Sequence, residues 1–229
     1  FIMLPIFSTQ GKKNFFSGLR LKMTKRHIQI KKSFRNELYR KSIHLSSLWI
    51  PALVYFAHPG ISIALFSFLL LADGIIEYGN FRKWRWARRS FGALFYKTLR
   101  SKELKKDKFQ VSGSMYVLAG AINCTMLYSK AVAANALTNM QTTDACAPLF
   151  GKAFGTRKLN KSKSLEGTAA FFLSALIIMM LFNPVYAVTY ASILAAAVAT
   201  LAEMFEDKIE IDDNLSVPLF VGIILTLLN

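Results

Sequence analysis

Long apolar stretches alternate with short basic ones along most of this sequence. Seven stretches are mainly apolar: 43–58, 60–76, 112–128, 131–150, 166–183, 185–205 and 216–229. A helix needs roughly 20 apolar residues to cross the hydrocarbon core of a bilayer, so the ends of the shorter stretches are approximate. The alternating ten-residue segments of barrel strands do not occur. The pattern therefore predicts an all-α, polytopic membrane helical bundle with about seven transmembrane helices.

The lysine and arginine residues are grouped between the apolar stretches. They lie within 12–41, 82–108 and 152–163, with Lys208 before the last stretch. Seven crossings put these four groups on one side of the membrane and leave only Lys130 on the other. By the positive-inside rule, the basic side is cytoplasmic. Most acidic residues lie near the same ends of the helices, which predicts one polar site at the cytoplasmic face.

The composition agrees with a membrane protein. Hydrophobic residues make up 53% of the chain and the mean hydropathy is +0.34, whereas a soluble domain covers its surface with charge. The net charge of +16 indicates an anionic bilayer surface or an anionic substrate as partner. Nucleic acid is disfavoured because the cations do not lie on a soluble scaffold. We expect a multi-pass integral membrane protein of the bacterial inner membrane, with endoplasmic reticulum and plastid membranes as alternatives.

Residues 1–36 form a basic arm, separate from a single membrane domain over 37–229. The arm contains no acidic residue, and Met23 is an alternative start. It is interpreted either as an organelle transit segment or as an amphipathic arm that binds a membrane surface. The loop 77–110 mixes aromatic residues with cations, which predicts an interfacial helix with Trp84 and Trp86 at headgroup depth.

The first candidate site motif is ELYRKSIH, residues 37–44. On a helix, Glu37, Arg40, Lys41 and His44 share one face. One interpretation is a surface pair of Glu37 with Lys41. The other is a basic face directed at phosphate, since arginine binds phosphate through two N–H groups and lysine as a point charge. His44 would then orient a phosphate or a hydroxyl.

The second motif lies in the polar stretch 131–150. Asn135, Thr138 and Thr142 form one polar stripe, which is expected to face the bundle interior. Asp144 would then lie within protein, where it could hold Mg²⁺ or a proton. The alternative is an acid paired with a nearby arginine.

A basic loop with two glycines follows this stretch. Gly151 and Gly155 could pack helices, but their place in a loop favours a backbone that approaches an anion. Ser164 can cap the next helix, and Glu166 suits its positive end. A helix N-terminus beside Lys163 is also an anion site. Together these features favour a phosphate-rich ligand.

A pair of acids precedes the last apolar stretch. Asp212, Asp213 and Asn214 are either an acidic helix start or a set of hard-cation ligands suited to Mg²⁺ on phosphates. Asp73 and Glu77 lie one helical turn apart. They either join the same site or pair with the cations of the loop after them.

Taken together, these motifs resemble the CTP-dependent lipid kinase family of dolichol, phytol and diacylglycerol kinases. The resemblance rests on ELYRKSIH, DACAPLFGKAFG, KSKSLEG and EMFEDKIEIDDNLSVP, which occur in that order over about residues 37 to 220. The middle block is also similar to phosphatidate cytidylyltransferase. That enzyme's later motif, K-D…H-G-G…D-R-x-D, is absent here. The kinase is therefore favoured, and the cytidylyltransferase remains the alternative.

The resemblance implies transfer of a phosphoryl group from CTP to a membrane lipid alcohol: a polyprenol, phytol or diacylglycerol. It implies catalytic roles for Arg40, Lys41, Asp144 and Lys163. The residues implied to contact CTP or its phosphates are His44, Gly151, Gly155, Ser164, Glu166 and Gly167. The residues implied to hold Mg²⁺ are Asp144, Asp212, Asp213 and Asn214.

Overall fold

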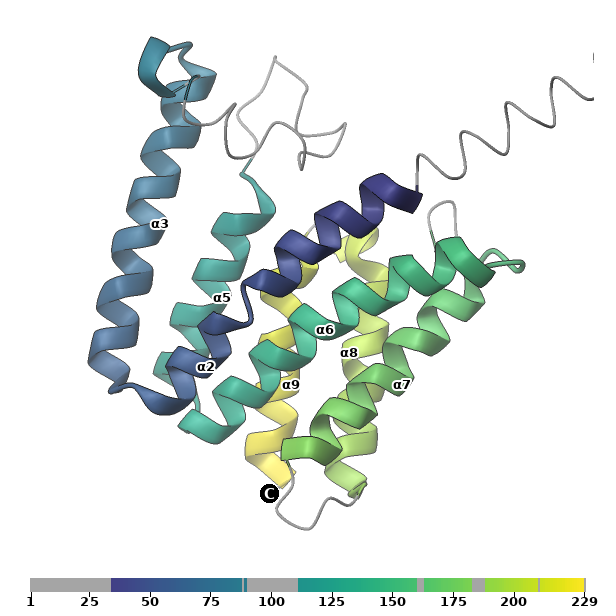
Figure 1. The fold of residues 1–229 in the computed structure, drawn as a ribbon. Helices are drawn as coiled ribbons and strands as arrows, with labels where there is room; N and C mark the ends of the chain where they lie inside the picture. The colour runs from purple at the N-terminus through teal and green to yellow at the C-terminus, as the bar shows by residue number, and fades with distance from the viewer. Residues whose placement is uncertain are drawn as a thin grey trace, which may run out of the picture.

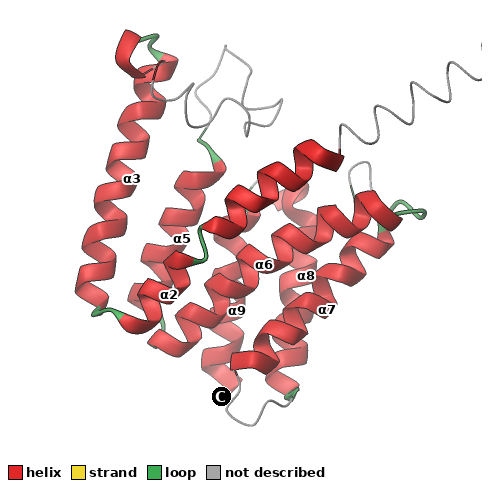
Figure 2. Cartoon of the chain, in the orientation of Figure 1, coloured by secondary structure: helices red, strands yellow, loops and turns green. Residues whose placement is uncertain are grey.

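The computed structural model describes residues 34–87, 89, 111–159, 163–182, 188–209 and 211–228. In this part of the chain, the regular elements are helices, and the β-structure is one isolated bridge between Lys158 and Ser164. A helix over 34–46 is followed by the labelled helices of Figures 1 and 2. They are α2 (Trp49–Phe56), α3 (Pro59–Phe81), α5 (Gly113–Leu127), α6 (Lys130–Phe154), α7 (Leu165–Phe182), α8 (Tyr190–Ile209) and α9 (Asp213–Leu228). The predicted all-α class is therefore confirmed.

The first predicted stretch, 43–58, is not one helix. The helix over 34–46 ends at a turn at residues 47–48, and α2 starts at Trp49. Pro51 has no N–H to donate to the carbonyl of Ser47, which weakens a continuous helix at the place where the break occurs. Proline is tolerated in the first turn of α2 instead. The Ser47 hydroxyl donates to the carbonyl of His44, which satisfies one of the last carbonyls of the first helix.

The other six predicted stretches each correspond to one helix, with different ends. Helix α6 continues past the predicted end at 150 to Phe154 and so includes Gly151 in its last turn. Gly155 is its C-cap. The expectation that both glycines lie in a loop is therefore wrong for Gly151. The helix extends because residues 149–154 contain no proline, and Pro148 removes only one backbone bond of the ladder.

Helix α6 lies at the centre of the bundle. It packs mainly against α7 and α9 and also contacts α2 and α5, whereas α3 lies at the edge beside α5 (Figure 1). Many residues in the core between these helices are alanines, among them Ala133, Ala136, Ala175 and Ala199. Small side chains let helix backbones approach closely, which is typical of helix packing in membranes.

Two of the described helices are long and apolar enough to cross a membrane. They are α3, with 23 residues, and α7, with 18. Helices α5 and α9 are also apolar but shorter. Several large apolar side chains of α3 point outward, and among them Phe68 is 67% exposed and Leu71 is 68% exposed.

The most deeply buried polar residues of α6 are not those of the predicted stripe. Asn135 is buried as expected, but Thr138 and Thr142 are only half-buried. The fully buried polar residues are Asn139, Gln141 and Thr143. Because α6 is central, it has neighbours on several sides, so one inward stripe does not describe its buried surface.

The end of α3 reverses the chain. Lys83 has a left-handed backbone with φ of 63°, and the N–H of Trp84 donates to the carbonyl of Gly79 at 2.8 Å. The ring of Trp84 lies edge-on to Tyr78, with 6.2 Å between the ring centroids, and Trp86 lies beside it. Most of the predicted interfacial helix, and residues 1–33 of the basic arm, lie outside the described residues.

Candidate functional site

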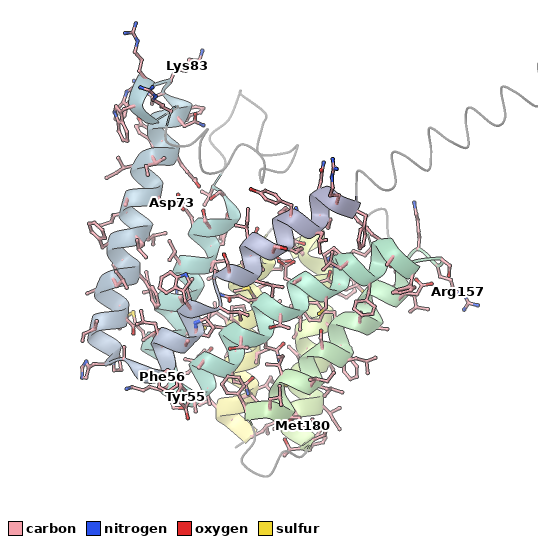
Figure 3. The ribbon with its side chains drawn as sticks, in the orientation of Figure 1. Tyr55, Phe56, Asp73, Lys83, Arg157 and Met180 are labelled. Carbon is pink, nitrogen blue, oxygen red and sulfur yellow. The ribbon has the colours of Figure 1, made fainter. Side chains whose placement is uncertain are left out.

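Charged side chains from five segments line one cavity of about 400 Å³. The helix over 34–46 contributes Arg40 and Lys41, and α6 contributes Asp144. Lys163 comes from the residues before α7, and Glu203 and Glu206 come from α8. Asp213, the first residue of α9, completes this group. Figure 3 shows Lys83 and Arg157 at the basic end of the helices, and Tyr55, Phe56 and Met180 at the opposite end.

Asp144 forms the centre of the first charge group. Its Oδ2 lies 2.6 Å from Lys41 Nζ and 3.3 Å from His44 Nε2. Lys41 is only 3% exposed, and a buried ammonium needs an opposite charge to offset its lost hydration. The expected pairing of Lys41 with Glu37 is therefore wrong. The alternative of an acid paired with a nearby cation holds for Asp144, with lysine and histidine in place of arginine.

Glu37 instead joins the first helix to the end of α6. It accepts a hydrogen bond from Arg40 and another from Lys152 Nζ at 2.7 Å. Burial raises the pKa of the Glu37 carboxyl, but the hydrogen bond from Lys152 and the charges of Arg40 and Lys152 outweigh burial and lower the pKa overall. The predicted helical face is thus divided. Lys41 and His44 turn to Asp144, whereas Arg40 is held by Glu37 at the cavity wall.

Lys163 connects the start of α7 to α8. Its Nζ lies 2.9 Å from Glu203 Oε1 and 3.6 Å from Glu206 Oε2, and it also donates to the backbone carbonyl of Glu203. This lysine was predicted as a site residue, and the structure places it in the cavity. Its two acidic partners were not predicted as ligands. Their spacing of three residues on one helix was the signal that could have identified them.

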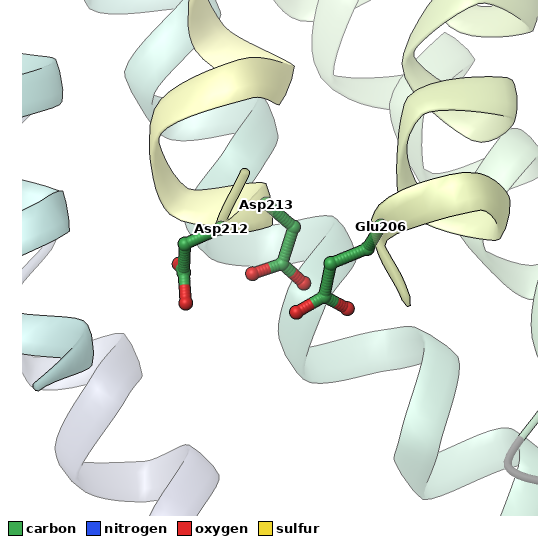
Figure 4. Close-up of side chains that lie close together, drawn as sticks. All are labelled: Glu206, Asp212 and Asp213. Atoms are coloured by element: carbon green, nitrogen blue, oxygen red, sulfur yellow. The ribbon is translucent and has the colours of Figure 1, made fainter. Parts of the chain in front are cut away.

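Three carboxylates meet at the gap between α8 and α9 (Figure 4). Oxygen atoms of Glu206, Asp212 and Asp213 all lie within 4.8 Å of one another. The Asn214 side-chain amide donates to Asp212 Oδ1 at 2.6 Å and to Asp213 Oδ1 at 3.2 Å, so it orients both acids. The buried Oδ1 of Asn214 has no hydrogen-bond partner among the described residues. Several oxygen ligands with no thiol or imidazole are the donor set that Mg²⁺ prefers.

Asp144 is not among the three acids whose oxygen atoms meet, although it was predicted as a metal ligand with Asp212 and Asp213. Asp144 lines the same cavity as Asp213, but the three acids whose oxygen atoms meet are Glu206, Asp212 and Asp213. The reason is the Lys41 ammonium, which occupies the position beside the Asp144 carboxylate. Asn214 also differs from its prediction, since it presents its amide nitrogen rather than its oxygen to the acids.

Glu166 does not line the cavity. Its carboxylate accepts hydrogen bonds from the backbone N–H groups of Thr156 and Arg157, and from the Thr156 hydroxyl. It therefore connects the loop after α6 to the first turn of α7. Its position outside the cavity does not support the expected direct contact with CTP. Ser164 accepts from the Gly167 N–H at 3.2 Å, which confirms the predicted cap.

Gly151 and Gly167 bring α6 and α7 into close contact at the cavity wall. A Cβ at Gly167 would lie 2.8 Å from the Ala147 carbonyl oxygen and 3.3 Å from the Gly151 Cα. A Cβ at Gly151 would lie 2.9 Å from Ser164 Oγ. Both glycines, together with Gly155, line the cavity, but their hydrogen side chains are required first by helix packing.

A second cavity, of about 460 Å³, adjoins the charged cavity and is also lined by the first helix. It shares Arg40, Lys41 and Asp144 with the charged cavity, but most of its remaining surface is apolar and comes from α2, α3, α5 and the first helix. Asp212 and Asn214, at the start of α9, also line it. At its border, the Ser114 hydroxyl donates to Asp73 Oδ2 at 2.6 Å, and the Ser112 N–H donates to Glu77. Asp73 and Glu77 thus join α3 to the start of α5.

One relative with a substantial alignment is the uncharacterized protein RP860 of Rickettsia prowazekii. It is 30% identical over 193 residues, which cover 81% of this chain and 91% of the relative. The chain belongs to the same family as RP860. An alignment that covers 81% of the chain must include its middle part, and therefore Asp144 and Lys163. No family model and no solved structure matches the chain.

Proposed function

We propose that this chain is a multi-pass membrane enzyme that transfers the γ-phosphoryl group of CTP to the hydroxyl of a lipid alcohol. The observation that carries the proposal is the charged cavity. It combines Arg40, Lys41 and Lys163 with the acids of α6, α8 and α9 in one space of about 400 Å³. A bound triphosphate needs cations for its oxygens, and its metal ion needs acids, so a cavity with both signs suits it.

The membrane location is supported by the apolar helices. Helices α3 and α7 are each long enough to span a membrane. In their most apolar 18-residue segments, only 17% and 22% of the residues are buried. We place the remaining helices across the same bilayer, giving the seven-span bundle with the charged cavity at the cytoplasmic face. The grouping of lysine and arginine residues on that side supports this orientation.

The side chains of the charged cavity, together with the neighbouring Asp212, divide into three groups by their role. Arg40, Lys41 and Lys163 neutralise charge on the phosphate oxygens and hold them in line with the acceptor hydroxyl. Glu206, Asp212 and Asp213 would hold Mg²⁺, which when bound neutralises the phosphates that it bridges. Asp144 holds the Lys41 ammonium in place at 2.6 Å and so acts as a positioning residue.

Labelled CTP tests this function directly. Membranes that contain the chain are supplied with CTP labelled at the γ- or at the α-phosphate, with Mg²⁺ and with a polyprenol, phytol, diacylglycerol or phosphatidate. We expect the γ label in the extracted lipid and the α label in CDP. An α label in the lipid would make the enzyme a cytidylyltransferase. No label in any lipid would overturn the proposal of CTP-dependent lipid chemistry.

A further inference from the structure

We infer that the second cavity receives the hydrocarbon chain of the lipid acceptor, while the charged cavity receives the nucleotide. This inference rests on the proposed function for the identity of the reaction. It goes further because it assigns the two substrates to separate, adjoining spaces. The helix over 34–46 contributes side chains to both.

The shared wall is the first step of the argument. Arg40, Lys41 and Asp144 line both cavities. A phosphoryl group in the first cavity and a hydroxyl in the second would therefore contact the same three side chains. In-line transfer requires the attacking and leaving oxygens to lie on opposite sides of one phosphorus atom. Two cavities that meet at one set of charges satisfy this requirement.

The chemistry of the second wall is the next step. Beyond the shared charges, most of its surface is apolar and comes from residues such as Trp49, Ile50, Leu69, Ile76, Val117 and Leu118. His44, Asp73 and Asp212 are also part of its wall. Apolar walls of this kind recognise hydrocarbon, and a volume of about 460 Å³ is within the range of ligand pockets. A nucleotide triphosphate suits the charged cavity better, because that cavity adds Lys152, Lys158 and Lys163 to the shared cations.

The position of α3 provides the route of entry. Helix α3 packs along α5 and contacts α2 only weakly, and its outer face is exposed. Trp49 on α2 lines the second cavity, and its ring lies 6.0 Å from that of Phe66 on α3 between their centroids. In a bilayer, a lipid chain can therefore enter between α2 and α3 without passing through water.

The polar patch on this wall also fits an alcohol. Ser114 donates its hydroxyl hydrogen to Asp73, and the hydroxyls of Ser112 and Ser114 lie 2.7 Å apart. With Ser114 donating to Asp73, Ser112 must donate to Ser114, so the group offers acceptors rather than free hydroxyl donors. It suits the hydroxyl of a lipid alcohol better than an ester carbonyl.

Filling the cavity from α3 tests the inference. Ala72 lines the second cavity and Ala64 lies exposed on the same helix, so Ala72→Phe and Ala64→Phe make the same change inside and outside. The first variant displaces part of a bound chain, so we expect the KM for diacylglycerol to rise about tenfold. The KM for CTP stays unchanged, and Ala64→Phe matches the wild type in both constants. Equal behaviour of the two variants would overturn the inference.

A binding measurement separates this inference from the reaction. A diacylglycerol with a mid-chain diazirine and a terminal alkyne is photolysed in membranes that contain the full chain, and the labelled peptides are mapped. We expect label in α2, α3 and α5, and about tenfold less of it in Ala72→Phe than in Ala64→Phe. Label that is confined to outer faces, or equal in both variants, would overturn the lipid cavity. Specific label without phosphorylation would retain the cavity and overturn the proposed kinase.

Discussion

Helices α3 and α6 are similar in length and opposite in design. Helix α3 has 23 residues and is strongly apolar, yet only 17% of the residues in its most apolar 18-residue segment are buried. Helix α6 has 25 residues and carries asparagine, glutamine and threonine side chains that are fully buried at the centre of the bundle. In a soluble protein the apolar helix would be inside and the polar helix outside.

This inversion indicates what surrounds the protein. In lipid, burying an apolar side chain gains little, because the lipid tails are as apolar as the protein core. Helices then associate through close packing of small residues and through polar contacts, which describes α6. An outer helix needs only apolar side chains that face the tails, which describes α3. In our proposal, the same contrast assigns the chemistry to α6 and lipid entry to α3.

The largest expected effect distinguishes an acid of α6 from an acid of α3. Asp144→Asn removes the charge that holds Lys41 in the cavity, so lipid phosphorylation should fall by about 10²–10³-fold while the protein still inserts. Glu77→Gln is the matched change on α3, since Glu77 lies outside both cavities. It should retain activity within a few fold. Initial rates at saturating CTP compare them, and near-wild-type activity of Asp144→Asn would remove its role.

A charge on the outer face of α3 tests the surroundings themselves. Phe68 is 67% exposed near the middle of the helix. If this face contacts lipid, Phe68→Asp costs about 2.5–3.5 kcal/mol on insertion, measurable as loss of the membrane-inserted fraction with a glycosylation reporter. If this face contacts water, the same change shifts stability by no more than about 0.5 kcal/mol. The second result would contradict a membrane-spanning α3.

Glycines on the two helices should respond oppositely to alanine. Gly151→Ala on α6 places a methyl group 2.9 Å from Ser164 Oγ at the contact with α7, so we expect a destabilisation of about 1–3 kcal/mol. Gly74→Ala on α3 meets only the end of the flexible Met115 side chain, at 3.4 Å. It should stabilise by about 0.5–1 kcal/mol through helix propensity. Denaturation in detergent measures both, and equal losses would contradict the close crossing.

Buried polar groups of α6 should also divide into two kinds. Gln141 is fully buried, and its side-chain amide has no hydrogen-bond partner among the described residues. Gln141→Met should therefore stabilise by about 1 kcal/mol. Asn139 donates to the Ala175 carbonyl at 3.1 Å, so Asn139→Leu should destabilise by a similar amount. A loss of stability in Gln141→Met would indicate a partner for this side chain.

The smallest effect concerns pH at the end of α6. The pKa of Glu37 is lowered in the folded protein, so its contribution is present above the ordinary glutamate pKa of about 4.3 and is lost as pH falls through the folded value. Glu37→Gln should remove this part of the acid dependence and change stability at neutral pH by less than about 1 kcal/mol. Melting temperatures from pH 7 down to pH 3 would detect the difference. Parallel curves for both proteins would contradict the pairing with Lys152.

Hydropathy alone predicts the helical class, because each of six predicted stretches holds one helix. The break before α2 requires the local chemistry of Pro51. Helical spacing also misassigns Lys41, since its partner Asp144 lies about a hundred residues away and only the packing of α6 brings them together. Glu206 is missed for the same reason: its relation to Asp212 and Asp213 depends on how the chain turns between α8 and α9.

The ion pair of Lys41 and Asp144 has one thermodynamic consequence. Because both cavities include this pair, a substrate bound in one cavity changes the electrostatic environment of a substrate bound in the other. Linkage then requires symmetry: the factor by which a nucleotide alters affinity for the alcohol equals the factor by which the alcohol alters affinity for the nucleotide. The two substrates would thus communicate through a single contact of 2.6 Å, with no movement of the helices.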